Sequence, residues 1–166
     1  MKIVVSDSTP LISLMKAELL DTLAGLFGEV LIPEAVFQEV TANEEFQDEA
    51  DQIKKSSFIR VVKVENTDRV SFLRRVTGLD LGESEAIVYA DDHQTDILLM
   101  DEAAGRRVAR SMSLHIQGTI GVLLQAYDQK IVTASEVKSA IQKLRDQKRH
   151  ISEKMYHYAE EYIKKG

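Results

Sequence analysis

The chain has no cysteine, no tryptophan and only two prolines among its 166 residues. Without cysteine it forms no disulfide bond, thiolate zinc site, iron–sulfur cluster or cysteine nucleophile. Its apolar runs are far shorter than the roughly 20 residues that a membrane-spanning helix needs. The first residues reach an acid at Asp7 without a long apolar stretch, so we expect no secretory signal. These absences favour a cytoplasmic protein that does not enter a membrane.

The composition is that of a globular protein. Apolar residues make up 44% and charged residues 29% of the chain, which suits a real core at this length. Short β-branched runs alternate with segments whose apolar residues recur at helical spacing. This alternation predicts an α/β fold with a mainly parallel sheet and helices on both faces. We expect strands at 2–6, 30–32, 58–64, 97–100 and 114–116, and helices at 11–26, 34–41, 43–57, 68–76, 82–92, 102–112, 118–127, 135–145 and 151–165.

A soft boundary near residues 147–151 suggests how the chain is divided. We expect a main domain over residues 1–145 and a C-terminal helical extension over residues 146–166. The spacing of apolar residues predicts that the terminal helix is amphipathic. Its apolar stripe is expected to contain Met155, Tyr158, Ala159 and Ile163.

Charge is distributed unevenly along the chain, whose net charge is −6. Residues 1–51 hold 2 basic and 11 acidic side chains, whereas residues 138–166 hold 8 basic and 4 acidic ones. A chance distribution of surface charge explains this pattern about as well as a functional role does. In the functional interpretation, basic groups bind a phosphate backbone while acidic groups hold a metal ion.

Two acids directly follow predicted strands. Asp7 comes after the run KIVVS, and Asp101 comes after the run ILLM. In a parallel sheet, ligands bind beyond the carboxyl ends of the strands, so both carboxylates are expected at one edge. Either residue alone is explained better by the ordinary occurrence of Asp at a strand end or a helix N-cap. The pair is stronger support for a site than either member.

Further acids lie on the predicted helices. Glu83 and Glu85 open an apolar helix, where they either complement the helix dipole or point at the same cavity as Asp7 and Asp101. Glu39 follows the second strand, and its spacing alone favours a solvated position. Several converging carboxylates would repel one another unless a divalent cation neutralised them. Oxygen ligands without cysteine favour Mg²⁺ or Mn²⁺ over zinc.

Polar and basic neighbours of these acids have two interpretations each. Ser8 and Thr9 either cap the helix that follows Asp7 or hydrogen-bond a carboxylate or a phosphate. Arg106 and Arg107 either reach a phosphate or form salt bridges with the acids, and the sequence favours the salt bridges. Glycines around Thr119 are explained better by tight helix packing than by an anion-binding turn. The four histidines show no zinc-type spacing.

Five segments, in this order, resemble the PIN-domain family, in particular a branch related to the ribonuclease toxins of toxin–antitoxin systems. The segments are VVSDSTPLI at 4–12, IPEAVFQEV at 32–40, LDLGESEAI at 79–87, LLMDEAAGRRVA at 98–109 and HIQGTIGVLL at 115–124. The resemblance implies a three-layer α/β/α sandwich with a short, mainly parallel sheet. It also implies an Mg²⁺- or Mn²⁺-dependent endoribonuclease that cleaves single-stranded RNA by water attack on a phosphodiester.

The resemblance also assigns roles to particular residues. It implies that the catalytic acids are Asp7, Glu39, Glu85 and Asp101. Glu83 and Glu102 join them as candidate metal ligands, with Glu83 a close competitor of Glu85. Ser8, Thr9, Arg106 and Arg107 are the candidate RNA-binding residues. The family likeness further implies a homodimer and an antitoxin partner.

Two other functions compete with a nuclease. A catalytically inactive PIN-like module that binds a protein fits the atypical pattern of acids, with Glu-x-Glu at 83–85 and Asp-Glu at 101–102. A phospho-acceptor receiver domain also has Asp at strand ends, but it requires adjacent acids after the first strand and a lysine after a late strand. Asp7 has no acidic neighbour, and residues 115–117 contain no lysine, so the receiver is the weakest of the three.

Overall fold

The core of the protein is a five-stranded sheet. The computed structural model describes residues 2–149 and 151–166. Its strands are β1 (Val4–Ser6), β2 (Val30–Pro33), β3 (Ile59–Val62), β4 (Ile97–Leu99) and β5 (Ile116–Gln117). They lie in the order β3-β2-β1-β4-β5, and every neighbouring pair is parallel. The predicted parallel sheet is therefore confirmed.

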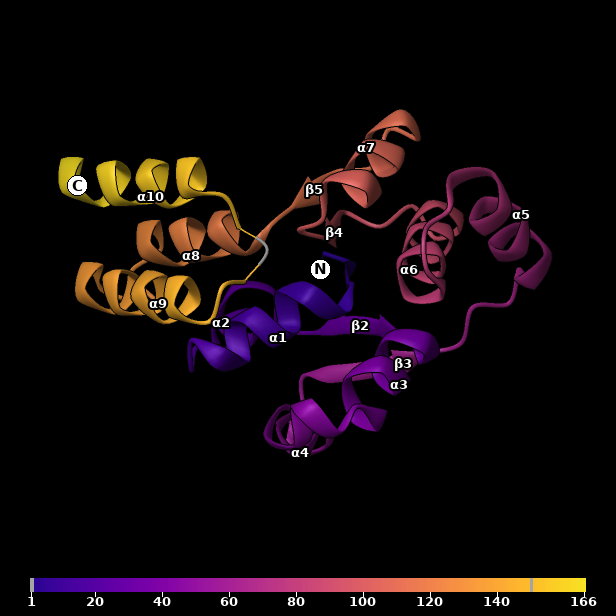
Figure 1. Ribbon diagram of the computed structural model, residues 1–166, viewed down its shortest axis with the longest axis horizontal. Coiled ribbons are helices and arrows are strands. Elements are labelled where there is room, and N and C mark those ends of the chain that lie inside the picture. The colour runs from indigo at the N-terminus through magenta and orange to yellow at the C-terminus, as the bar shows by residue number, and fades with distance from the viewer. Residues whose placement is uncertain (1, 150) are drawn as a thin grey trace.

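Helices cover both faces of the sheet, so the fold is the expected three-layer α/β/α sandwich (Figure 1). The helices lie close to their predicted positions because apolar periodicity reports the buried face of each one. They are α1 (Ser8–Lys16), α2 (Thr22–Phe27), α3 (Glu34–Ala42), the 3-10 turn η1 (Glu44–Phe46), α4 (Gln47–Lys55), α5 (Thr67–Thr77), α6 (Leu81–Asp92), α7 (Ala103–Ser111), α8 (Thr119–Asp128), α9 (Ala134–Asp146) and α10 (Glu153–Lys165).

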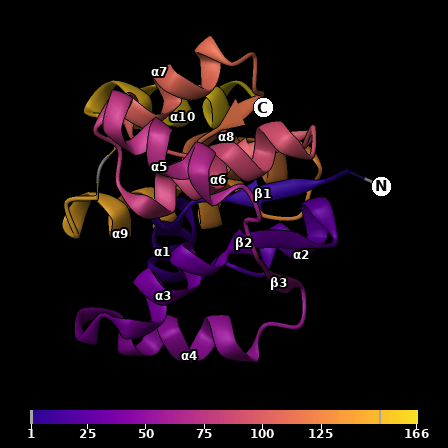
Figure 2. The same cartoon turned by 90° about the vertical axis from the view of Figure 1, so that its right-hand side faces the viewer.

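Successive residues of each strand serve opposite faces, as the two-residue period of a strand requires. Val4 and Leu99 pack into the larger core, formed with α1 to α4 and α8 to α10. Val5 and Leu98 pack into the smaller core, formed with α5, α6 and α7. In Figure 1 the helices α8, α9 and α10 lie on one side of the strands, and α5 and α6 lie on the other. Figure 2 shows α3 and α4 at one end of the molecule, away from α7 and α10.

The predicted helix over residues 11–26 is wrong as a single element. The chain forms α1 and α2 with a break between them, and Glu18 in the break has a φ of 61°. The apolar spacing runs through the break because Ala17 and Leu20 are buried in the same core as both helices. Spacing reports burial and not the continuity of the backbone, so it misses a turn whose side chains still point inward.

The terminal helix α10 packs against α8 and α9. Tyr156, Ala159 and Ile163 are its buried residues, and the hydroxyl of Tyr162 donates to Asp128 at the end of α8. The predicted stripe is only half right, because Met155 is 41% and Tyr158 is 57% exposed. Residue 150, within the expected boundary, lies outside the described residues. In the described part of the chain, no helix is both long and apolar enough to cross a membrane.

We predict that α10 contributes directly to the stability of the fold. Replacing Ile163, which is 5% exposed, by alanine leaves a cavity in the larger core. Loss of the Ile163 side chain is expected to lower the free energy of unfolding, measured by urea denaturation, by about 2–4 kcal/mol. The matched change Tyr158→Ala on the exposed side of α10 is expected to cost under about 1 kcal/mol. Equal effects of the two changes would contradict this packing.

Candidate active site

The candidate site lies beside β1, at the point where the order of strand addition in the sheet reverses. The chain builds β1, β2 and β3 outward on one side, and then places β4 and β5 on the other side of β1. Ser6 of β1 pairs with Leu99 of β4, and the backbone N–H of Asp7 donates to the carbonyl of Leu99 over 2.9 Å. In open α/β sheets, such a switch point at the carboxyl ends of the strands is where ligands bind.

Asp7 follows β1 and is almost completely buried, with 1% of its surface exposed. Burial raises its pKa well above the ordinary value, although the N–H of Ser8 donates a hydrogen bond that opposes the rise. The nearby carboxylates of Glu83, Glu39 and Asp80 raise the pKa further. Within the described residues, Oδ1 of Asp7 has no hydrogen-bond partner. An oxygen of this kind costs free energy unless a proton or a cation satisfies it.

Glu83 lies in the first turn of α6 and points at the same place. It is 7% exposed, and its Oε2 also lacks a hydrogen-bond partner in the described part of the chain. Asp80, the N-cap of α6, accepts the backbone N–H of Glu83 over 2.8 Å and thereby fixes this turn. Burial raises the pKa of Glu83 to about 8, and the charges of Asp80 and Glu102 contribute to the rise.

Glu39 and Glu102 complete the group of acids. Glu39 is an exposed residue of α3, yet desolvation raises the pKa of its carboxyl group. The charges of Asp80 and Glu102 raise this pKa further, whereas a hydrogen bond from Ser8 lowers it. Glu102 follows β4, and its Oε1 accepts the hydroxyl of Thr9 over 3.4 Å. We call these five residues the carboxylate cluster. Its members are Asp7, Glu39, Asp80, Glu83 and Glu102.

Two of the predicted acids have other partners. Oε1 of Glu85 accepts the backbone N–H of Ala35 over 3.1 Å, at the start of α3. The carboxylate of Asp101 accepts both the backbone N–H and the hydroxyl of Thr119, over 2.8 and 2.6 Å. Burial still raises the pKa of Asp101, against the effect of these hydrogen bonds. Asp101 and Glu85 thus hold the first turns of α8 and α3, while Glu102 and Glu83 face the cluster.

The predicted basic residues differ in their surroundings. Arg106 is half-buried and donates from Nη1 to the carbonyl of Met100 over 2.9 Å. Arg107 is exposed. No salt bridge joins either arginine to an acid in the described part of the chain. Burial lowers the pKa of Arg106, and the positive charge of Arg110 lowers it further.

Sequence reasoning missed two residues that lie near these acids. Asp80 is the N-cap of α6, and an acid directly before a helical pattern is a typical signal for that position. Arg149 lay in a basic tail with no particular partner, yet its Nε donates to Ser13 of α1 over 3.1 Å. The charges of Asp101 and Glu102 act on its pKa, although burial is the larger effect and lowers it. No sequence signal identifies Arg149, because only the chain path after α9 brings it there.

A divalent cation fits the chemistry of the cluster. Two buried carboxylate oxygens, on Asp7 and Glu83, lack partners, and oxygen-only donors are what Mg²⁺ and Mn²⁺ prefer. Gly105 leaves room beside them, since a Cβ there would lie 3.0 Å from Oε2 of Glu83 and 2.6 Å from Sδ of Met100. In residues 2–149 and 151–166, however, no three acidic or histidine side chains converge closely enough to hold a metal ion.

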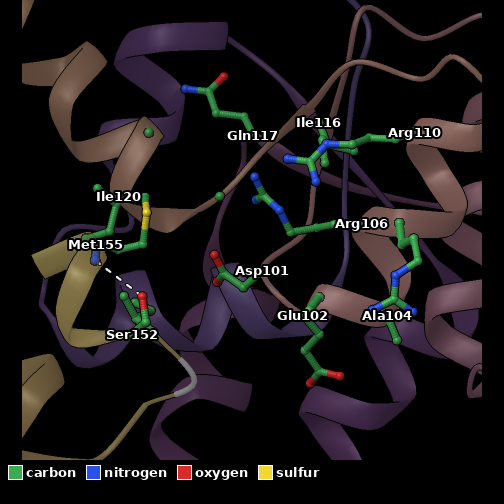
Figure 3. A pocket seen from close by; sticks show the side chains of 15 residues that line it. Asp101, Glu102, Ala104, Arg106, Arg110, Ile116, Gln117, Ile120, Ser152 and Met155 are labelled. Carbon is green, nitrogen blue, oxygen red and sulfur yellow. Dashed lines mark hydrogen bonds between the residues drawn. The ribbon is translucent and has the colours of Figure 1, made fainter. Parts of the chain in front are cut away.

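A groove of about 960 Å³ opens beside the cluster. Asp101, Glu102 and Arg106 line it together with residues of α7, α8 and the start of α10. Figure 3 shows Arg106 and Arg110 reaching in from α7 and facing Ile120 and Met155. Gly118 permits this arrangement, because a Cβ at that position would lie 2.8 Å from Oδ1 of Asp101 and 2.9 Å from Nη1 of Arg106. Close approach to these side chains accounts for this glycine.

We predict that the metal-free protein loses stability as the pH rises. The unfolded chain releases the Glu83 proton near pH 4.3, whereas the folded chain holds it up to about pH 8. Stability is therefore fully present below the unfolded pKa and lost as the pH rises through the folded pKa. The pKa values of Asp7 and Glu39 are also raised in the folded chain, so these groups too make stability fall as the pH rises. Differential scanning fluorimetry in EDTA is expected to show Tm falling by on the order of 5 °C between pH 5 and 8.

The change Glu83→Gln removes one of these titrating groups and is expected to flatten the Tm profile. The exposed Glu161 gives the matched control Glu161→Gln, which is expected to leave the profile unchanged. A profile that is flat in the unaltered protein would show that the cluster is not desolvated. An equally steep profile in the Glu83 variant would show that other groups cause the loss.

The comparisons with known proteins agree with the fold. No curated protein and no solved structure gives a significant match to the chain. One family model, DUF3368, described as a PIN domain, matches residues 3–165. This match covers nearly the whole chain, including α10, and PIN domains have a nuclease-type fold. The chain therefore belongs to the PIN-domain family.

Proposed function

We propose that the protein is a metal-dependent endoribonuclease that cleaves single-stranded RNA by water attack on a phosphodiester. The observation that supports this most is the unpartnered, buried Oδ1 of Asp7 beside the like-charged Glu83. Carboxylates held together in this way need a positive charge to remain ionised. Their location at the switch point of the sheet supports a site that acts on a ligand.

Asp7 and Glu83 are the proposed principal ligands of Mg²⁺ or Mn²⁺, with Glu39 and Glu102 at the rim of the site. Both lie near Asp7, since Ser8 acts on the pKa of Glu39 and the hydroxyl of Thr9 donates to Glu102. When bound, the cation lowers the pKa of water and stabilises the leaving oxygen. The assignment differs from the sequence-based one in favouring Glu83 over Glu85 and Glu102 over Asp101.

Glu85 and Asp101 are proposed as positioning residues. Glu85 accepts the N–H of Ala35 in the first turn of α3, the helix that carries Glu39. Asp101 holds Thr119 at the start of α8 and lies on the groove beside Arg106. Each fixes an element that borders the cluster. Their loss is expected to act on the geometry of the site and less on the binding of the cation.

Arg106 is the proposed contact to RNA, and water is the proposed nucleophile. Arg106 lines the groove and offers a cation to a phosphate near the cluster. The chain has no cysteine, and the Ser8 hydroxyl is engaged with Glu39. In-line attack by water on the phosphorus needs no covalent enzyme intermediate and completes the hydrolysis.

The cellular setting is part of the proposal. The motifs resemble those of ribonuclease toxins, which supports a cytoplasmic homodimer that an antitoxin silences. A second candidate function is a PIN-like module that binds a protein and does not cleave RNA. The observation that favours it is that no three acids of the described residues converge on one point.

We predict Mn²⁺-dependent cleavage of a labelled single-stranded RNA. EDTA is expected to abolish cleavage, and Asp7→Asn or Glu83→Gln is expected to reduce its rate by about 100-fold or more. Glu85→Gln, which keeps an oxygen to accept the Ala35 N–H, is expected to reduce the rate by less than about 10-fold. Glu161→Gln serves as the control at an exposed position of α10. The rates are compared by gel electrophoresis of the products.

Two outcomes would overturn the assignment. Cleavage that survives both EDTA and Asp7→Asn would disprove a metal mechanism at this site. A larger loss in Glu85→Gln than in Glu83→Gln would return the ligand role to Glu85. Absence of cleavage by the unaltered protein across varied RNAs, in Mg²⁺ and in Mn²⁺, would favour the binding module.

A further inference from the structure

The groove beside the carboxylate cluster has two chemically different walls. One wall is cationic and comes from α7, which contributes Arg106, Arg107 and Arg110. The opposite wall is apolar and contains Ile120, Ile151 and Met155. Figure 3 shows Arg106 and Arg110 on one side and Ile120 and Met155 on the other. The volume of about 960 Å³ lies near the upper end of the range for small-molecule sites in proteins.

In the described part of the chain, no salt bridge pairs an arginine of the cationic wall with an acid, although the charge of Asp101 acts on Arg106. Arg107 and Arg110 are exposed, and neither forms a salt bridge or a side-chain hydrogen bond in the described part of the chain. Arg106 and Arg110 are four residues apart on one helix, where like charges lie close and repel each other. An anion between these guanidinium groups removes the repulsion, and phosphate, like carboxylate, matches their planar fork of donors.

The apolar wall is available to a ligand. Met155 is 41% exposed although it stands on a helix with a well-packed opposite face. Ile151 is half-buried, and Ile120 is 3% exposed. Methionine adapts its shape and makes favourable contacts with aromatic rings. A wall of this kind, opposite three arginines, offers a surface for a flat ring that is attached to a phosphate.

We propose that this groove binds one nucleotide of the RNA next to the cleaved bond, with its phosphate on the arginines of α7 and its base against Met155 and the isoleucines. The inference rests on the proposed function, since it names a substrate contact of the same site. Glu102 connects the two places, because it lines the groove and belongs to the carboxylate cluster. A strand that lies in the groove therefore passes the cluster at Glu102.

RNA fits this groove better than a protein segment does. An acidic peptide would match the arginines, but its carboxylates would bring no flat ring to the apolar wall. A nucleotide satisfies both walls at once, because its charge and its aromatic base lie on opposite sides of one sugar. The wall is aliphatic and contains no aromatic side chain, so the contact favours a base by burial and less by stacking.

The test measures binding separately from cleavage. All proteins carry Asp7→Asn to prevent cleavage, and Mg²⁺ is present throughout. Fluorescence anisotropy follows a labelled oligoadenosine of about ten nucleotides and a matched oligomer whose residues are abasic. The variants are Met155→Ala and Arg110→Ala. Their controls are Tyr158→Ala, on the same helix as Met155 but outside the groove, and Arg74→Ala, on the exposed surface of α5.

Met155→Ala is expected to weaken binding of oligoadenosine by roughly three- to ten-fold and to leave the abasic oligomer unaffected. Arg110→Ala is expected to weaken binding of both oligomers by a similar factor and to reduce the salt slope by about 1. Both controls are expected to bind like the parent protein. Circular dichroism confirms that each variant is folded.

The outcomes distinguish this inference from the proposed function. If the protein with Asp7 intact cleaves RNA but Met155→Ala binds both oligomers normally, the base contact is wrong and the nuclease assignment stands. If Arg110→Ala is also neutral, RNA does not occupy the groove, as expected if a protein binds there. If the protein neither binds nor cleaves RNA, the proposed function fails and this inference fails with it.

Discussion

The site depends on holding several negatively charged carboxylates close together at the switch point of the sheet. Asp7 is buried almost completely, and Glu83 lies beside it with an oxygen that no group in the described residues satisfies. Such an arrangement is unfavourable for the folded chain by itself, because each negative charge raises the cost of ionising the next. It persists because the two cores on either face of the sheet hold β1, β4 and α6 in place.

The acids around this site divide into two groups according to whether a buried oxygen is left without a hydrogen-bond partner in the described residues. Asp101 and Glu85 each accept an N–H at the start of a neighbouring helix, and Asp80 does so at the start of its own. These hydrogen bonds satisfy donors that a helix leaves open at its first turn. Asp7 and Glu83 retain unpartnered oxygens. Residues of one type thus support the structure in one place and, in another, keep oxygens without a partner among the described residues.

The C-terminal part of the chain shapes the surroundings of the site. Helix α10 packs on α8 through Tyr156, Ala159 and Ile163, and its first turn places Met155 on the groove. Arg149, which precedes this helix, contacts Ser13 of α1 and brings a positive charge near Asp101. The contribution of α10 follows from packing, since this helix is distant in sequence from every acid of the cluster. The family match, which extends to residue 165, includes this helix.

Most of the fold could be predicted from the sequence, because burial imposes a period on each element. The strand runs before Asp7 and Asp101 indicated a parallel pair, and these strands are neighbours in the sheet. The failures occurred where burial and backbone geometry disagree. Residues 17–21 are a turn although Ala17 and Leu20 are buried, and Met155 and Tyr158 are apolar yet exposed. Spacing cannot separate these cases, because it records polarity and not the partner that covers a side chain.

The sequence by itself determined the chemical type of the site: oxygen ligands only, no thiolate, and acids at the ends of two buried strands. The proposal of Glu83 over Glu85, and of Glu102 over Asp101, rests only on the tertiary structure. Members of each pair are one or two residues apart, so their spacing carries almost the same information. What separates them is a hydrogen-bond donor from a distant element, Ala35 for Glu85 and Thr119 for Asp101, and only the folded chain brings such donors into contact.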